Sequence, residues 1–193
     1  AKEGLDLIAT GEMGIGNTTT ASAVAAALTG ESVQRMTGRG AGLTDAGLSR
    51  KVDAIRRALS VNAPDPADVM DVLRKVGGFD LCAMAGAFLG GAECGVAVMV
   101  DGFISSVAAL AARRMEPESA DFMLASHVSR ENAGAFLLKQ LGLTPVLTAG
   151  MALGEGTGAV AVMPLLDMAL AVYRGATFAD ISVEAYQPLG GGA

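Results

Sequence analysis

The chain has 193 residues, of which 51% are hydrophobic and 4% aromatic, and its formal net charge is -6. This length and apolar content suffice for one well-buried domain, so we predict a single domain over residues 1–193. The acidic balance, with no run of cations longer than pairs such as Arg56-Arg57 and Arg113-Arg114, argues against a nucleic-acid-binding surface.

The most apolar window, Leu81–Val100, is interrupted by Glu93 and four glycines, which argues against a membrane span. The first residues show no basic segment followed by an apolar core, so we expect no secretory signal. Cys82 and Cys94 lie apart, without the spacing of metal ligands, in apolar contexts typical of buried free thiols. We therefore expect a cytoplasmic protein.

Strand candidates alternate with helix candidates along the chain, which predicts a Rossmann-like α/β fold: a largely parallel sheet flanked by helices in three α/β/α layers. The predicted strands are Leu5–Ala9, a weak one at Ser32–Thr37, Val96–Val100, Phe122–Ala125 and Pro145–Thr148. The predicted helices are Ala21–Leu28, Thr44–Leu59, Ala67–Val76, Leu81–Leu89, Phe103–Met115, Ala133–Leu141 and Ala159–Tyr173, the last interrupted by Pro164.

A glycine-rich stretch, Gly11–Thr20, lies between the first predicted strand and the first predicted helix. It matches the phosphate-loop pattern except that Asn17 stands where that pattern has lysine. An amide has no charge with which to hold outer phosphates, so hydrolysis of a triphosphate is disfavoured, whereas backbone N–H groups and hydroxyls can hold a monophosphate. The alternative is a turn without a ligand, but Glu12 between glycines has no turn-forming reason.

Two further glycine-rich turns, Gly38–Gly42 and Gly150–Gly158, are predicted at other corners of the fold, and Glu155 lies at the centre of the second of these. Asp101 and Ser129 also follow predicted strands. Because the carboxyl ends of parallel strands share one edge, we expect these residues to line a ligand site there.

Each of these residues also has an ordinary structural explanation. Asp101 can cap a helix, Lys51 can be a solvated side chain, and Ser129 can begin the helix that follows it. His127, the only histidine of the chain, is interpreted as a structural side chain, because a serine and a histidine as neighbours without a partner do not make a hydrolase.

Six motifs together resemble the nicotinate-nucleotide:dimethylbenzimidazole phosphoribosyltransferase family. They run in order from Leu7 to about Phe178, which is nearly the whole chain. The resemblance implies an enzyme that transfers phosphoribose from nicotinate mononucleotide to a benzimidazole, releasing nicotinate and forming α-ribazole phosphate for the lower ligand of cobalamin. The motifs are Gly11–Thr19, Gly38–Gly42, Val76–Phe79, Val100–Ile104, Ala125–His127 and Leu153–Gly158.

The resemblance also implies roles for individual residues. Glu155 is implied as the general base that takes the benzimidazole N–H proton, Glu12 as an active-site residue close to the substrates, and Asp101 as a neighbour of the sugar. A homodimer is implied, without a metal or a cofactor. The residues that it places around the phosphate and ribose are Gly14, Gly16, Asn17, Thr18, Gly40, Gly42, Lys51 and Ser129.

Full-length members of that family carry an additional amino-terminal part that helps to form the benzimidazole pocket, and this chain shows no counterpart. We therefore expect either a fragment or a shortened homologue. One alternative is a noncatalytic nucleotide- or phosphate-binding module. Another is a degenerate phosphate-loop ATPase with Asp101 as its magnesium ligand, which Asn17 disfavours.

Overall fold

The computed structural model describes residues 2–177 and 179–184. Phe178, where the resemblance ends, and residues 185–193 of the predicted domain lie outside the described residues. The chain divides into two compact units, residues 1–161 and 162–193. The second unit contains most of α8 (Thr157–Tyr173) and a short 3-10 helix, η2 (Ala179–Ile181).

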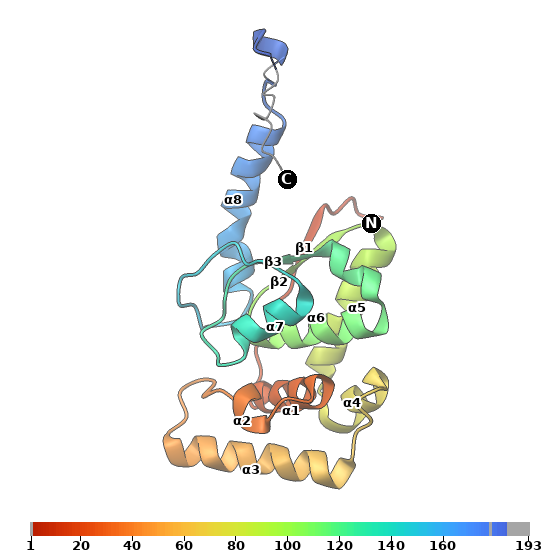
Figure 1. The fold of residues 1–193 in the computed structure, drawn as a ribbon, viewed down its shortest axis with the longest axis vertical. Coiled ribbons are helices and arrows are strands. Elements are labelled where there is room, and N and C mark those ends of the chain that lie inside the picture. The colour runs from red at the N-terminus through yellow and green to blue at the C-terminus, as the bar shows by residue number, and fades with distance from the viewer. Residues whose placement is uncertain (1, 178, 185–193) are drawn as a thin grey trace, which may run out of the picture. The chain divides into compact units, whose positions relative to one another are not determined.

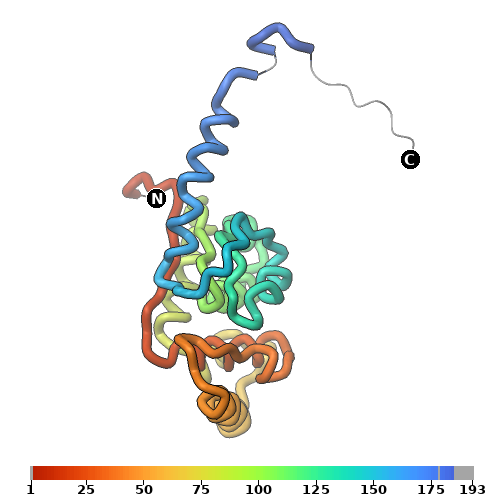
Figure 2. Tube along the Cα trace, turned by 90° about the vertical axis from the view of Figure 1, so that its left-hand side faces the viewer, coloured from red at the N-terminus to blue at the C-terminus, as the bar shows by residue number. Residues whose placement is uncertain are grey.

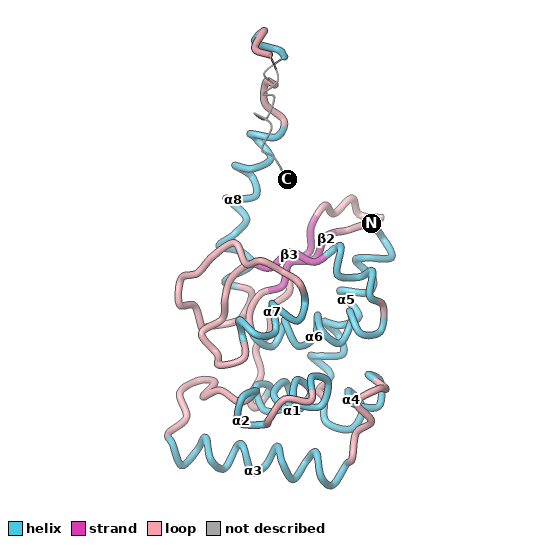
Figure 3. The backbone as a smooth tube through the Cα atoms, in the orientation of Figure 1, coloured by secondary structure: helices cyan, strands magenta, loops and turns pink. Residues whose placement is uncertain are grey.

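The first unit contains a parallel three-stranded sheet, in agreement with the α/β prediction (Figures 1 and 3). Its strands are β1 (Leu7–Ala9), β2 (Ala97–Val100) and β3 (Met123–Ala125), in the order β1-β2-β3. The central strand β2 is the predicted apolar run, and its last three residues are fully buried. A strand with neighbours on both sides in a parallel sheet has no solvent-facing edge, which explains its uninterrupted apolar sequence.

Helices flank this sheet and then pack on one another. Helices α5 and α6 contact each other and β2, α6 also packs against α1 and α7, and α3 lies beside α1 (Figures 1 and 2). Within the described residues, no helix is long and apolar enough to cross a membrane. The remaining bounds are α1 (Asn17–Thr29), α2 (Val33–Met36), α3 (Asp45–Asn62), α4 (Val69–Val76), α5 (Phe79–Cys94), α6 (Phe103–Met115), η1 (Pro117–Phe122) and α7 (Gly134–Leu141).

Alternation along the strands places one face of the sheet in the core. Val98 and Val100 of β2 belong to the main cluster of buried apolar residues, together with side chains of α5, α6 and α7. Met99, which points to the opposite face, is fully buried but lies outside that cluster. The helices of this core therefore hold β2 and the loop that follows it in place.

Two predicted strands are wrong or incomplete. Ser32–Thr37 contains the short helix α2, because the Ser32 side chain accepts a hydrogen bond from the backbone N–H of Arg35 and so caps a helix. Pro145–Thr148 forms no strand: it makes a single parallel bridge between Leu147 and His127, and the segment between α7 and α8 is otherwise loop (Figure 3).

Two further details differ from prediction. Helix α1 begins at Asn17 rather than Ala21, so the threonine run belongs to its first turns. Cys82 and Cys94 are exposed rather than buried, and both are free thiols. The prediction of buried cysteines fails because they lie off the face of α5 that reaches the core, which is the one carrying Phe88.

Replacement of Phe88 by alanine should destabilise the fold strongly. Phe88 is 0% exposed, and removal of a buried aromatic ring typically costs about 3 to 5 kcal/mol of the free energy of unfolding. Phe79 on the same helix is 95% exposed, so Phe79→Ala is a matched control that should change stability by about 0.5 kcal/mol or less. Urea unfolding followed by circular dichroism measures both. Equal losses would contradict this account of the core.

Candidate active site

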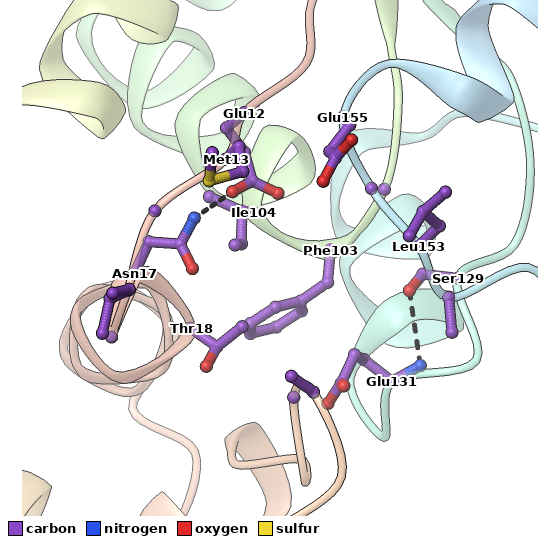
Figure 4. Close-up of a pocket in the computed structure, with 18 of the residues that line it drawn as sticks. Glu12, Met13, Asn17, Thr18, Phe103, Ile104, Ser129, Glu131, Leu153 and Glu155 are labelled. Carbon is purple, nitrogen blue, oxygen red and sulfur yellow. Dashed lines mark hydrogen bonds between the residues drawn. The ribbon is translucent and has the colours of Figure 1, made fainter.

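Loops after β1, β2 and β3 meet around a cavity of about 610 Å³ (Figure 4). That volume is in the range of small-molecule sites. Side chains from every one of the three strand ends reach it, as expected for the carboxyl edge of a parallel sheet. Its walls are formed by Glu12–Thr18, Gly40 and Ala41, Gly102–Ile104, His127, Ser129, Glu131 and Ala152–Glu155.

The first glycine turn leads directly into α1. Gly16, at the helix N-cap, has a φ of 84°, a left-handed conformation that glycine adopts at little cost, and it has no side chain to cap the helix. The first turn of α1 contains no acidic residue. The positive end of the helix dipole, with Asn17 and Thr18, therefore faces the cavity and favours an anion.

Glu12 lies in this turn and has an unusual protonation equilibrium. Burial raises the pKa of Glu12 from 4.5 to about 7. A hydrogen bond donated by the Asn17 amide opposes that rise, whereas the negative charges of Asp80, Asp101 and Glu155 add to it. At neutral pH a large fraction of Glu12 is therefore protonated, which suits a group that gains or loses a proton.

Glu155 reaches the same side of the cavity from the third glycine turn. Its φ is 58°, and its neighbours Gly154 and Gly156 have φ values of 80° and 78°. The Glu155 N–H donates to the Glu12 carbonyl oxygen at 3.2 Å. Both side chains line the cavity, and they are neighbours in Figure 4.

Gly11 makes this approach of the two turns possible. A Cβ on Gly11 would overlap the backbone of Gly156, so a residue larger than glycine would push the turns apart. Glu12 and Glu155, which are 143 positions apart in the sequence, are thereby held close together in the fold. The close approach at Gly11 thus joins the first glycine turn to the third.

Lys51 of α3 is buried next to the cavity. Its Nζ donates to Thr18 Oγ1 at 2.8 Å and to the Gly38 carbonyl oxygen at 3.0 Å. Burial lowers the pKa of Lys51, and the charge of Glu131 opposes this shift. Lys51 therefore joins the start of α1 to the second glycine turn and supplies positive charge behind Thr18.

Most of the residues predicted from the sequence lie around one cavity, although not all of them face it. Lys51 is buried behind Thr18, and Gly42 is exposed and does not line the cavity. The carboxylate of Asp101, which is 3% exposed, is directed at the backbone of the third glycine turn. Those that line the cavity are Glu12, Gly14, Gly16, Asn17, Thr18, Gly40, Ser129 and Glu155.

Sequence reasoning assigned no role to several lining residues. Met13, Ile15 and Leu153 are large apolar side chains that are mostly exposed at the cavity. Their position inside glycine-rich turns, which do not belong to the core, was the sequence signal that could have identified them as lining residues. Glu131 also lines the cavity, and its carboxylate occupies the space that a Cβ on Gly38 would fill. Nothing in the local sequence around Glu131 indicated this long-range contact.

His127 has the structural surroundings expected of it. It is 3% exposed, its Nδ1 lies 3.0 Å from Ser126 Oγ, and burial lowers its pKa. The ring lies close to Gly102 and Gly158. Across the described residues, no three His, Cys, Asp or Glu side chains are grouped as a metal ion would require.

Comparisons with known proteins agree with this geometry. A phosphoribosyltransferase family model matches residues 1–183. The chain is 48% identical over 188 residues to the nicotinate-nucleotide–dimethylbenzimidazole phosphoribosyltransferase of Acetivibrio thermocellus, covering 97% of this chain and 54% of that protein. It is 52% identical over 181 residues to the enzyme of the same name from Desulforudis audaxviator, covering 93% and 51%.

A solved structure is also similar. The crystal structure of CobT from Thermus thermophilus matches with a TM-score of 0.89 and 44% sequence identity, covering 95% of this chain and 55% of that chain. The chain thus spans about half the length of the curated relatives it matches.

The pKa of Glu12 should depend on Asn17. Asn17→Ala removes the amide that favours the charged carboxylate, so the pKa of Glu12 should rise above its value of about 7. Carboxyl-carbon NMR titration measures it. Asn132→Ala is the control, since the Asn132 amide donates to the Thr37 carbonyl oxygen instead and its loss should leave Glu12 unchanged. A midpoint for Glu12 near 4.5 in the unmodified chain would refute the assignment.

Proposed function

Because the chain belongs to the nicotinate-nucleotide–dimethylbenzimidazole phosphoribosyltransferase family, we propose that it forms the catalytic portion of such an enzyme. It would transfer phosphoribose from nicotinate mononucleotide to dimethylbenzimidazole, giving α-ribazole phosphate and nicotinate for the lower ligand of cobalamin. The observation that carries this proposal is that Glu12 and Glu155, joined through their backbones, line one cavity together with the start of α1, whose helix dipole favours an anion.

The phosphate end of the substrate would lie at the start of α1. Backbone N–H groups of the first turn and the helix dipole favour an anion there, and Lys51 supplies a positive charge through its hydrogen bond to Thr18. The side chains of Asn17, Thr18 and Ser129 add neutral polar groups. We assign the phosphate and ribose to Gly14, Gly16, Asn17, Thr18, Gly40, Gly42, Lys51 and Ser129.

The carboxylate end suits the chemistry of glycosyl transfer. The bond between the anomeric carbon and the nicotinate ring nitrogen breaks, its electron pair returns to that nitrogen, and positive charge develops at the carbon. Negative charge on Glu12 or Glu155 stabilises this transition state. The benzimidazole nitrogen that carries no hydrogen forms the new bond to the anomeric carbon with its lone pair.

One proton must leave the acceptor as that bond forms. We assign its removal to Glu155, whose side chain lines the cavity mouth, and the released proton ends on this carboxylate. Glu12, with its pKa raised to about 7, lies beside Glu155 and is the residue to compare with it for this role. The exposed apolar side chains of Met13, Ile15 and Leu153 offer a surface for a flat aromatic acceptor.

We further propose that the enzyme works in the cytoplasm as a homodimer. The chain's acidic charge of -6 and its relatedness to biosynthetic enzymes support a metabolic role there. The competing function is a phosphate-binding module without turnover. Release of nicotinate from nicotinate mononucleotide and dimethylbenzimidazole separates the two.

Nicotinate mononucleotide should bind and ATP should not, because Asn17 carries no charge for outer phosphates. Lys51→Met, which removes the ammonium but keeps the length of the side chain, should weaken mononucleotide binding by about 1 to 3 kcal/mol. Lys139, exposed on α7, provides the control Lys139→Met, which should bind normally. Isothermal calorimetry decides it: tight magnesium-dependent binding of ATP alone would eliminate the proposal.

Glu155→Gln should lower turnover by about 10² to 10⁴ in the complete enzyme while mononucleotide affinity stays nearly unchanged, because glutamine keeps the shape but accepts no proton. Glu93→Gln, at an exposed position of α5, is the control for loss of one negative charge. Nicotinate release gives the rate.

Glu12→Gln is the informative comparison for this assignment. If both acids only stabilise charge at the anomeric carbon, the two substitutions should cost similar amounts, and an acceptor that is already ionised should rescue neither. Normal turnover of the Glu155→Gln enzyme would end the assignment of Glu155 as the base.

A further inference from the structure

Asp101 follows β2 directly, and its side chain makes two hydrogen bonds that have no role in the chemistry proposed above. Its side chain is buried, and both of its oxygens accept backbone hydrogen bonds from the segment around Glu155. Oδ2 accepts from the Gly156 N–H at 3.2 Å, and Oδ1 accepts from the Ala159 N–H at 3.0 Å. One carboxylate therefore holds both the third glycine turn and the first turn of α8.

The backbone of Asp101 is itself anchored on both sides. Its N–H donates to Ser105 Oγ at 3.1 Å, and its carbonyl oxygen accepts from Ser126 Oγ at 2.9 Å. Ser105 Oγ lies 2.5 Å from Thr10 Oγ1, at the end of β1. The carboxylate thus projects from a point connected to all three strands, which makes it a rigid support.

The turn that it holds needs such a support. Gly154, Glu155 and Gly156 all have positive φ, and a residue with a Cβ, such as Glu155, rarely adopts this conformation unless its surroundings impose it. The Asp101 carboxylate accepts a hydrogen bond from Gly156, the residue after Glu155, and the Glu12 carbonyl oxygen accepts one from the Glu155 N–H. These two contacts determine the direction in which the Glu155 side chain leaves the backbone.

Close packing beneath the turn leaves no room for other geometries. A Cβ on Gly158 would overlap the His127 ring and would lie 2.9 Å from Asp101 Oδ1. The start of α8 therefore approaches Asp101 and His127 as closely as a glycine backbone permits. Glycine at position 158 thus allows the turn to lie close to its support, and the two hydrogen bonds join them.

We propose that Asp101 is a positioning residue that acts through Glu155: its carboxylate fixes the third glycine turn so that Glu155 faces the reacting atoms. The effect on catalysis rests on the proposed transferase function, whereas the effect on the turn does not. This role differs from the contact with the sugar that the resemblance implied for Asp101.

Asp101→Asn tests the proposal, because asparagine keeps the shape but has one acceptor oxygen where the aspartate has two. In the complete enzyme kcat should fall by about 10²-fold, the size of loss caused by small misplacements of a catalytic group, while KM for nicotinate mononucleotide stays unchanged. Asp121→Asn, at an exposed position of η1, controls for charge and should change neither. A higher KM with unchanged kcat would instead support a sugar contact and overturn the proposal.

Amide hydrogen exchange tests the turn independently of activity. In the unmodified chain the N–H groups of Gly156 and Ala159 should exchange at least about tenfold more slowly than that of Gly158, which has no hydrogen-bond partner among the described residues. Asp101→Asn should remove the protection of at least one of them. Equal exchange at all three positions of the unmodified chain would overturn the proposal even if the variant failed to fold.

The two experiments separate failure of the proposal from failure of the proposed function. If the complete enzyme releases no nicotinate, the transferase assignment fails, but the exchange rates still decide whether Asp101 holds the turn. If the enzyme is active and Asp101→Asn leaves kcat and exchange unchanged, the transferase assignment stands and the positioning role is lost.

Discussion

The candidate site depends on one contact between two backbone segments that are far apart in the sequence. The N–H of Glu155 donates to the carbonyl oxygen of Glu12, and Gly11 leaves space for the backbone of Gly156 to come alongside. A hydrogen bond between backbones fixes position more firmly than one between long side chains, since fewer rotatable bonds separate the joined atoms. Both side chains begin from this junction, so the fold sets the separation of the two backbone positions from which the carboxylates extend.

The sheet makes the junction possible. Strand β2 pairs with β1 on one side and β3 on the other, and its apolar residues are held in the helical core, so the residues after it are rigidly placed. Gly102–Ile104, from the end of β2, enter the cavity beside residues that follow β1 and β3. The three strands end at the same cavity because parallel pairing brings their carboxyl ends to one edge of the sheet.

The sequence indicated the glycine turns at this edge and eight of the residues that line the cavity, because glycine spacing and apolar runs are local signals. It did not predict the short helix α2, where the cap formed by Ser32 outweighs the strand preference of Val33. It also misjudged Cys82, since the apolar composition of α5 does not reveal which face meets the core. Long-range arrangements were out of reach: no local pattern indicates that Asp101 accepts from Gly156 and Ala159.

The electrostatics of the cavity bear on the ligand that we propose for it. The positive pole of α1 lines the cavity, and Lys51 lies behind it with the Glu131 carboxylate close by. Glu12 and Glu155 line the same cavity, and Asn17 at the start of α1 donates a hydrogen bond to Glu12. The proposed substrate, nicotinate mononucleotide, has a phosphate that the start of α1 can hold and a positively charged ring nitrogen that the carboxylates can face. As that charge passes from the ring nitrogen to the anomeric carbon, it remains close to the same carboxylates. In the proposed reaction the same carboxylates would therefore stabilise both the bound substrate and the transition state.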